Sequence, residues 1–189
     1  MKFLNVGGNS KDIGVPTHFQ GWEHVLLDIQ AGPGVDLVLD ARELVNQPAG
    51  EYDAVYCSHN LEHYYPHDAV LVLDGIRHVL KETGFVEIRV PDIGALVQLI
   101  AKQKLQMNSK VYDSPMGPIT VQDIIYGYSR QIMESGNDFY AHKTGFMQDS
   151  LTQLLGRCGF PYIRVLPPLS FLEIHVMARK VPVLVELVP

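Results

Sequence analysis

Residues 53–90 read DAVYCSHNLEHYYPHDAVLVLDGIRHVLKETGFVEIRV, and this stretch decides the fold. Its two ends, Asp53–Cys57 and Phe85–Val90, are short apolar runs of the kind found in strands that are covered on both faces. Asp68 is placed to cap the start of a helix between them, and Gly84 to follow its end. The stretch therefore predicts two parallel strands joined by a helical crossover. The apolar residues of the helix recur at helical spacing: Ala69, Val72, Leu73, Ile76, Val79 and Leu80.

The same alternation of strand and helix patterns continues on both sides of this unit. Toward the N-terminus, the runs Phe3–Val6, His24–Ile29 and Val35–Leu39 predict three more strands. Toward the C-terminus, Leu151–Cys158 follow helical spacing, and Gly159 is placed as the stop signal. Repeated strand and helix patterns of this kind are typical of an α/β protein with a parallel sheet.

The last two strand patterns are too close together for a crossover. Tyr162–Leu166 and Phe171–Arg179 are separated only by the turn at residues 167–170, so they should form an antiparallel hairpin. We therefore expect an α/β fold in which five parallel strands are closed by a C-terminal antiparallel hairpin. The final residues 181–189 read VPVLVELVP, which would suit an edge strand or a contact in a homo-oligomer.

A long insertion interrupts the alternation. Residues 91–147 contain one apolar helical segment, Ile93–Ile100, followed by a looser run rich in Gly, Pro, Tyr and Met. Connections of this length usually carry function. We expect one domain over residues 1–189, in which the insertion forms a lid or contacts the substrate.

The composition limits the kinds of molecule that the protein is expected to bind. The formal charge of −6 and a pI near 5.7 disfavour an extended surface for nucleic acid, and favour a small-molecule or glycan partner. The chain contains no apolar run of about 18 residues that could span a membrane, and its start lacks the pattern of a signal peptide. Cys57 and Cys158 fall in apolar patterns, which indicates buried free thiols. These features predict a cytoplasmic protein.

Three successive strand ends carry residues suited to a nucleoside. Gly7 and Gly8 end the first strand, Asp28 ends the second, and the pair Asp40 and Ala41 ends the third. Ligands of open α/β sheets bind at the carboxyl ends of the strands, where a carboxylate can accept hydrogen bonds from ribose hydroxyls. Each residue taken alone could equally serve a turn or a cap. Together they predict one crevice for an adenosine-containing cofactor.

The chain resembles the class I S-adenosylmethionine-dependent methyltransferases, in particular those of the methyltransferase type 11 group. The resemblance implies a Rossmann-like fold with S-adenosylmethionine as cofactor. It would place Gly7, Gly8 and the adjacent Asn9 near the amino-acid part of the cofactor, and Ser58 near the methyl donor. By the same resemblance, Asp28 would bind the ribose and Asp40 with Ala41 the adenine. The resemblance rests on these segments: LNVGGN, GWEHVLLDI, DARELV, YDAVYCSHNLEH, IRHVLKETGFVEIRVPDIGAL and HKTGFMQDSLTQLLGRCGF.

The chain departs from that family at the glycine loop. The loop reads GGNS, without the longer glycine-rich run of the family. Residues 9–22 are too few for this loop and a full crossover helix. We therefore expect the first crossover helix to be shortened or lost.

Several polar residues could carry the chemistry. His59 and His63, just after the fourth strand, are candidates for a general base, because imidazole titrates near neutral pH. Each could instead bond to the backbone at a helix start. Glu62 could accept hydrogen bonds from the substrate or the cofactor amine, or could equally be solvated. His142 and Lys143, at the end of the insertion, could contact the substrate or could belong to a helix-entry loop with Phe146 packed inward.

The histidine spacing also raises the question of a metal. His59, His63 and His67 recur every four residues, but Pro66 interrupts a continuous helix there. The sequence therefore predicts no metal site.

The predicted function is methyl transfer from S-adenosylmethionine to a hydroxyl, amine or carboxylate of a small molecule or saccharide. A nicotinamide-dependent dehydrogenase is disfavoured, because the chain lacks G-x-G-x-x-G. A catalytically weak relative that binds a metabolite or a partner protein remains the alternative from another class, owing to the short glycine loop.

Overall fold

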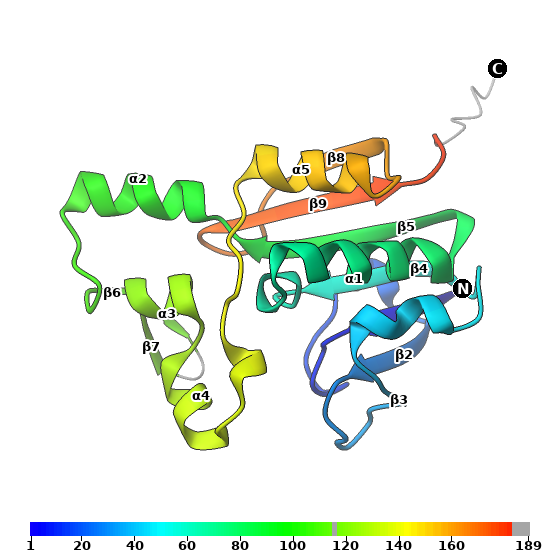
Figure 1. Cartoon of the computed structure of the whole chain (residues 1–189), viewed down its shortest axis with the longest axis horizontal. Helices are drawn as coiled ribbons and strands as arrows, with labels where there is room; N and C mark the ends of the chain where they lie inside the picture. Colours follow the sequence, from blue (N-terminus) through cyan, green and yellow to red (C-terminus); the bar gives the residue numbers. More distant parts are fainter. Residues whose placement is uncertain (115–116, 183–189) are drawn as a thin grey trace.

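A computed structural model describes residues 1–114 and 117–182 of the chain. Seven strands form one sheet in the order β3-β2-β1-β4-β5-β9-β8 (Figure 1). The first five are parallel to one another, and β9 is antiparallel to both β5 and β8. The predicted parallel sheet with a C-terminal hairpin is confirmed. The strands are β1 Lys2–Val6, β2 Glu23–Asp28, β3 Leu37–Val38, β4 Tyr52–Ser58, β5 Leu80–Pro91, β8 Tyr162–Leu166 and β9 Glu173–Arg179.

Two strands are shorter than the sequence predicts. β3 keeps two residues, because the Asp36 carboxylate turns back to accept the backbone N–H of Leu26 at 2.7 Å. β9 begins at Glu173, since Leu172 has a left-handed φ of 56° that an extended strand cannot contain. A side-chain hydrogen bond shortens the first of these strands, and a left-handed backbone conformation shortens the second.

The ends of helix α1 also differ from the prediction. α1 spans Pro66–Val79, so Asp68 lies in its first turn and does not cap it. Pro66 suits the first helical position, because a proline has no N–H to leave without a partner. The placing of Gly84 after the helix was wrong too: β5 begins at Leu80, directly after the last helical residue, and Gly84 lies within the strand.

One face of the sheet is covered by α1, α5 (Gln148–Arg157) and the 3-10 segment η2 (Ala41–Asn46). α5 begins before Ser150, whose hydroxyl accepts the backbone N–H of Met147 at 3.0 Å, and it ends before Gly159, as predicted. Side chains in the core between these elements and the sheet are fully buried, and this packing holds the strands and the loops that follow them in place. The buried side chains include Val72, Leu73 and Ile76 of α1 against Val86, Ile88 and Val90 of β5.

The opposite face has a smaller, aromatic core. The first crossover contains only the 3-10 turn η1 (Thr17–Phe19), which confirms that a crossover helix is missing. Phe19 stacks on Phe3 of β1 with ring centroids 4.4 Å apart, and Trp22 meets Phe19 edge-on at 5.4 Å. A compact aromatic cluster therefore takes the place of a helix on this face.

The insertion forms a lobe beyond the end of β5 (Figure 1). α2 agrees with the predicted helical segment, whereas the other elements were not predicted. The lobe consists of α2 Ile93–Gln103, β6 Lys110–Ser114, β7 Gly117–Thr120, α3 Val121–Tyr126, α4 Ser129–Ser135 and the 3-10 turn η4 Asp138–Tyr140.

Three remaining expectations concern the two cysteines, membrane-spanning segments and the apolar tail. Cys57 and Cys158 are buried free thiols, as predicted. Among the described helices, none has both the length and the apolar character that crossing a bilayer requires. The expectation for the apolar tail concerns residues 181–189, of which 183–189 lie outside the described part of the chain.

Candidate active site

The carboxyl ends of the parallel strands border a cavity of about 500 Å³, which we call the first cavity. The lining residues are Gly7 and Asn9 after β1, Asp28 at the end of β2, Asp40 after β3 and His59 after β4. The three strand ends that were predicted to bind a nucleoside thus border the same cavity. A volume of this size is typical of pockets for small molecules and cofactors.

Gly7 is fixed in a conformation that only glycine adopts without strain. Its φ is 72°, and its N–H donates to the carbonyl of Leu27 at 2.8 Å. A Cβ at this position would overlap the Asn60 side chain, with the amide carbon only 2.6 Å away. The backbone at Gly7 therefore lies open to the first cavity and tightly against the loop that follows β4.

The Asp28 carboxylate holds two loops in place. Its Oδ2 accepts the backbone N–H of Asn9 at 3.0 Å, and its Oδ1 accepts that of Gln30 at 3.0 Å. A carboxylate offers about four acceptor positions, so about two are left for a ligand in the cavity. The loops after β1 and β2 are thus joined through the residue that was predicted to bind ribose.

Asp40 is paired with an arginine that the sequence analysis did not select. It accepts the backbone N–H of Arg42 at 3.0 Å, and the guanidinium binds both carboxylate oxygens, at 3.1 Å from Nε and 2.6 Å from Nη2. Burial opposes the charge on Asp40, but the hydrogen bonds from Arg42 outweigh it and lower the pKa of the carboxyl. Arg42 also lies 3.4 Å from Asp68. Asp40 is therefore a charged carboxylate with a fixed orientation.

A second cavity of about 530 Å³ adjoins the first and is lined mainly by the insertion. His59 and His63 line both cavities and so form the boundary between them. Glu62 and His142 line the second cavity only. Further lining residues of the second cavity include Tyr112, Asp123, Ile124, Ser170 and Phe171.

His59 lies between two carboxylates. Its Nε2 is 3.3 Å from Glu173 Oε2, and its Nδ1 is 3.5 Å from Glu62 Oε1. Burial alone would lower the pKa of this imidazole, but the hydrogen bond with Glu173 and the nearby Glu62 carboxylate raise it to about 9. Glu173 is itself held by Arg89, whose Nη2 lies 2.5 Å away. His59 is therefore an imidazolium at neutral pH, with both ring nitrogens directed at acceptors.

His63 and His142 have a different arrangement. His63 Nδ1 lies 3.2 Å from the carbonyl of Ala141, and His142 Nδ1 lies 2.9 Å from the carbonyl of Ile124. A carbonyl only accepts, so each Nδ1 carries the proton, and the neutral ring has its lone pair at Nε2. Burial lowers the pKa of His142, which favours this neutral form. The two rings meet edge to face, 4.9 Å apart.

The fold of this chain is similar to those of several solved structures. No protein-family model and no curated protein matches the chain. An S-adenosylmethionine-dependent methyltransferase from Archaeoglobus fulgidus is 15% identical over 95% of this chain and 86% of its own, with a TM-score of 0.59. One from Methanosarcina mazei is 16% identical over 95% and 92%, with a TM-score of 0.59. The chain has the class I methyltransferase fold.

A third match was solved with ligands. The 1,6-didemethyltoxoflavin-N1-methyltransferase from Burkholderia thailandensis is 16% identical over 95% of this chain and 71% of its own, with a TM-score of 0.57. Its structure contains 1,6-didemethyltoxoflavin and S-adenosylhomocysteine.

Three of the residues predicted to bind cofactor are not among those that line the first cavity of this methyltransferase fold. Gly8 turns toward Asn5 and Leu26, Ala41 is buried, and Ser58 ends β4 without lining either cavity. Lys143, predicted to bind substrate, lines the first cavity.

The insertion contributes residues to the first cavity that the sequence analysis missed. Tyr140 donates to Gln30 Oε1 at 3.0 Å, which connects the insertion to the loop after β2. The only sequence signal for this contact was the aromatic pair Phe139 and Tyr140 beside His142 and Lys143. The lining residues from this part of the chain are Gln131, Asp138, Phe139, Tyr140 and Lys143.

Proposed function

We propose that this protein is an S-adenosylmethionine-dependent methyltransferase that binds the cofactor in the first cavity and the methyl acceptor in the second. The observation that carries the proposal is the shared wall: His59 and His63 line both cavities. A group transferred from one cavity to the other would pass beside these two side chains. The methyltransferase neighbours, one of them with S-adenosylhomocysteine bound, support this choice of cofactor.

The residues of the first cavity fit an adenosine cofactor. Gly7 lines this cavity, and Asp28 retains acceptor positions for the two ribose hydroxyls. Asp40, oriented by Arg42, would accept the adenine amino group. The insertion would serve as a lid, because its hydrogen bond from Tyr140 to Gln30 connects it to the opposite side of the cavity.

The acceptor is a small molecule or a saccharide in this proposal. The second cavity is about as large as the first, and both polar and aromatic side chains line it, including Tyr112, Asp123 and His142. Such a lining suits a polar ring compound or a sugar that presents a hydroxyl, an amine or a carboxylate. The buried thiols agree with a reducing compartment, and we include a cytoplasmic location in the proposal.

In methyl transfer, the main task of the protein is to align the acceptor with the methyl group of the cofactor. S-adenosylmethionine supplies a methyl group that is activated by its sulfonium. The chain would align the acceptor with that methyl group and remove a proton where the acceptor is a hydroxyl. Of the two predicted bases, His63 suits proton removal better, since both ring nitrogens of His59 face carboxylates. His59 would position Glu62 and Glu173 at the boundary.

Calorimetry with S-adenosylhomocysteine tests the first half of the proposal. We expect saturable binding of one equivalent, followed by methyl release when glycan precursors and small hydroxy acids are screened as acceptors. Absence of binding at millimolar ligand would overturn the cofactor assignment. Tight binding with no turnover on any acceptor would favour the alternative of a metabolite-binding relative, which the helix-less glycine loop motivates.

A further inference from the structure

Three side chains on the wall of the second cavity have the composition of a metal site. Glu62, His63 and His142 each place one potential ligand atom within 4.8 Å of the other two. We propose that these three residues bind a divalent transition-metal ion. They come from two separate parts of the chain: Glu62 and His63 from the turn η3 (Leu61–His63), and His142 from the end of the insertion.

The Glu62 carboxylate is the strongest observation. The residue is 1% exposed, and neither carboxylate oxygen has a hydrogen-bond partner among the described residues. His59 offers nearby positive charge, but its Nδ1 stays 3.5 Å from Oε1. A buried ionised carboxylate that accepts no hydrogen bond is costly, and buried charges in proteins are usually paired or coordinate metals. A bound cation would provide a partner for the carboxylate oxygens of Glu62.

Glu87 provides an internal contrast. It is equally buried, but its Oε1 is hydrogen-bonded to His175 Nε2 at 2.9 Å. Its Oε2 also has no hydrogen-bond partner among the described residues, but it lies 2.8 Å from His18 Nε2. One oxygen of Glu87 is thus hydrogen-bonded and the other has a histidine close by, whereas neither oxygen of Glu62 is hydrogen-bonded. His63 and His142 instead direct their Nδ1 protons to backbone carbonyls, away from Glu62.

The two histidines are oriented as metal ligands usually are. A ligating histidine typically donates its second ring N–H to a backbone carbonyl or a carboxylate, which fixes the tautomer and the ring. His63 does this with Ala141 O, and His142 with Ile124 O. The remaining nitrogen of each ring, Nε2, is the atom that can coordinate an ion.

The backbone around the three residues is also held together. The carbonyl of Glu62 accepts the N–H groups of Lys143 at 2.8 Å and Thr144 at 3.2 Å. These bonds attach the end of the insertion to η3, and the His63 bond to Ala141 adds a third link. The ligand geometry is therefore built by the fold before any ion binds.

The ligand types select the class of ion. Two imidazoles and one carboxylate suit zinc and neighbouring transition metals, whereas magnesium and calcium prefer all-oxygen sites. Three protein ligands leave a coordination position open toward the second cavity. If the proposed methyl transfer holds, that position would take the acceptor oxygen, and the ion would lower the pKa of the acceptor, so that His63, bound to the ion, would no longer serve as the base.

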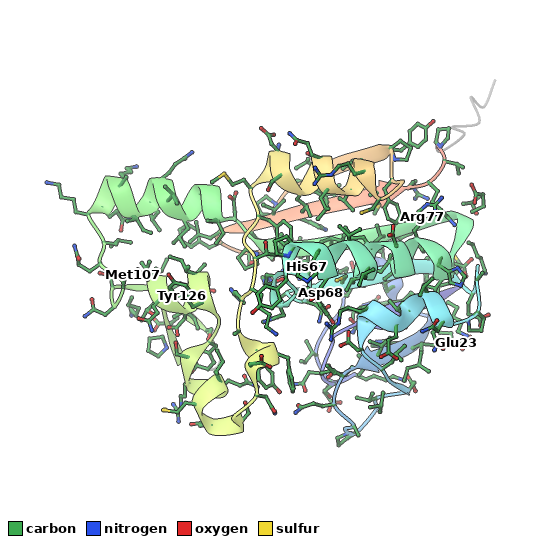
Figure 2. All side chains as sticks on the ribbon, viewed as in Figure 1. Glu23, His67, Asp68, Arg77, Met107 and Tyr126 are labelled. Atoms are coloured by element: carbon green, nitrogen blue, oxygen red, sulfur yellow. The ribbon has the colours of Figure 1, made fainter. Side chains whose placement is uncertain are left out.

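This cluster differs from the spacing that the sequence analysis considered and rejected. His67 lies on α1 with 79% of its side chain exposed and is not part of the cluster (Figure 2). It is therefore a suitable control, because it is a histidine close in sequence to the proposed ligands.

The test is zinc binding by the full-length protein, followed by calorimetry after chelator treatment and desalting. We expect one saturable equivalent, and expect Co²⁺ in the same site to give visible absorption bands. Glu62→Gln and His142→Ala should each weaken zinc binding by more than about a hundredfold, because loss of an outer partner alone costs about 10- to 100-fold. His67→Ala should bind as the wild type does.

The readout does not involve methyl transfer, so its failure is distinguishable from failure of the proposed function. Absence of a one-to-one zinc site in the wild-type protein would by itself overturn the proposal, even where a variant does not fold. Wild-type affinity in folded Glu62→Gln and His142→Ala, verified by melting curves of the metal-free proteins, would overturn it as well.

Discussion

The substitution Asp28→Ala tests the first cavity most directly. In the structure, the Asp28 carboxylate uses two acceptor positions for the backbone N–H groups of Asn9 and Gln30, both at 3.0 Å, and about two positions are left for ribose hydroxyls. A hydrogen bond to a charged group contributes about 1.5–3 kcal/mol. Loss of even one such bond should therefore weaken S-adenosylhomocysteine binding by about 10- to 100-fold.

Two further variants separate the ligand contact from loop disorder. Asp28→Asn keeps one carbonyl oxygen as an acceptor, so its affinity should fall between those of the wild type and Asp28→Ala. Asp74→Ala removes the same charge from the exposed face of α1 and should leave binding unchanged. Calorimetry gives the dissociation constants. A dissociation constant for Asp28→Ala within about twofold of the wild type would refute the assignment of this carboxylate to the ribose.

Four other outcomes follow from the geometry. Gly7→Ala should lower the melting temperature and weaken S-adenosylhomocysteine binding. A non-glycine residue in the left-handed region costs about 1–2 kcal/mol, and its Cβ would overlap Asn60. A wild-type binding curve would contradict this. His63→Gln should reduce turnover by about a hundredfold or more while the affinity for S-adenosylhomocysteine stays the same, as steady-state kinetics and calorimetry can measure. The folded-state pKa of Asp40 is lowered, so its stabilising effect is present above the unfolded pKa of about 3.9 and is lost as pH falls through the lower folded value. Melting curves between pH 6 and pH 2 should thus converge for wild type and Asp40→Asn, and parallel curves would argue against the pairing with its arginine. Leu73→Ala, at a fully buried position of α1, should cost about 2–5 kcal/mol of unfolding free energy in denaturant titrations without changing the ligand affinity.

The sheet could be predicted from the sequence because its strands are buried on both faces. Runs such as AVYC in β4 leave a continuous apolar signal, and the short turn before β9 leaves no room for a crossover. The positions of Gly7, Asp28 and Asp40 follow from the same logic, since they sit where those runs end. The apolar pattern does not show side-chain hydrogen bonds, such as the one that the Asp36 carboxylate accepts from the backbone N–H of Leu26. The ends of the strands were therefore the least accurate part of the predicted sheet.

The insertion could not be predicted in the same way. Its helices α3 and α4 have six and seven residues, too few for a clear helical period. The approach of His142 to His63 depends on a contact between residues 78 positions or more apart, for which local spacing has no signal. Local spacing instead pairs His63 with His67, because these two histidines are close in sequence.

The aromatic cluster that replaces the first crossover helix gives the protein an optical reporter. Trp22 is the only tryptophan of the chain, and it packs edge-on against Phe3 and Phe19 at 6.4 and 5.4 Å. It stands at the end of the loop that begins at Asn9, whose backbone binds Asp28. Its emission therefore arises from one known environment, and a shift on adding ligand would record rearrangement of residues 9–22. Loss of the cluster on unfolding should move the emission maximum to longer wavelength, so one fluorophore reports both ligand response and stability without any label.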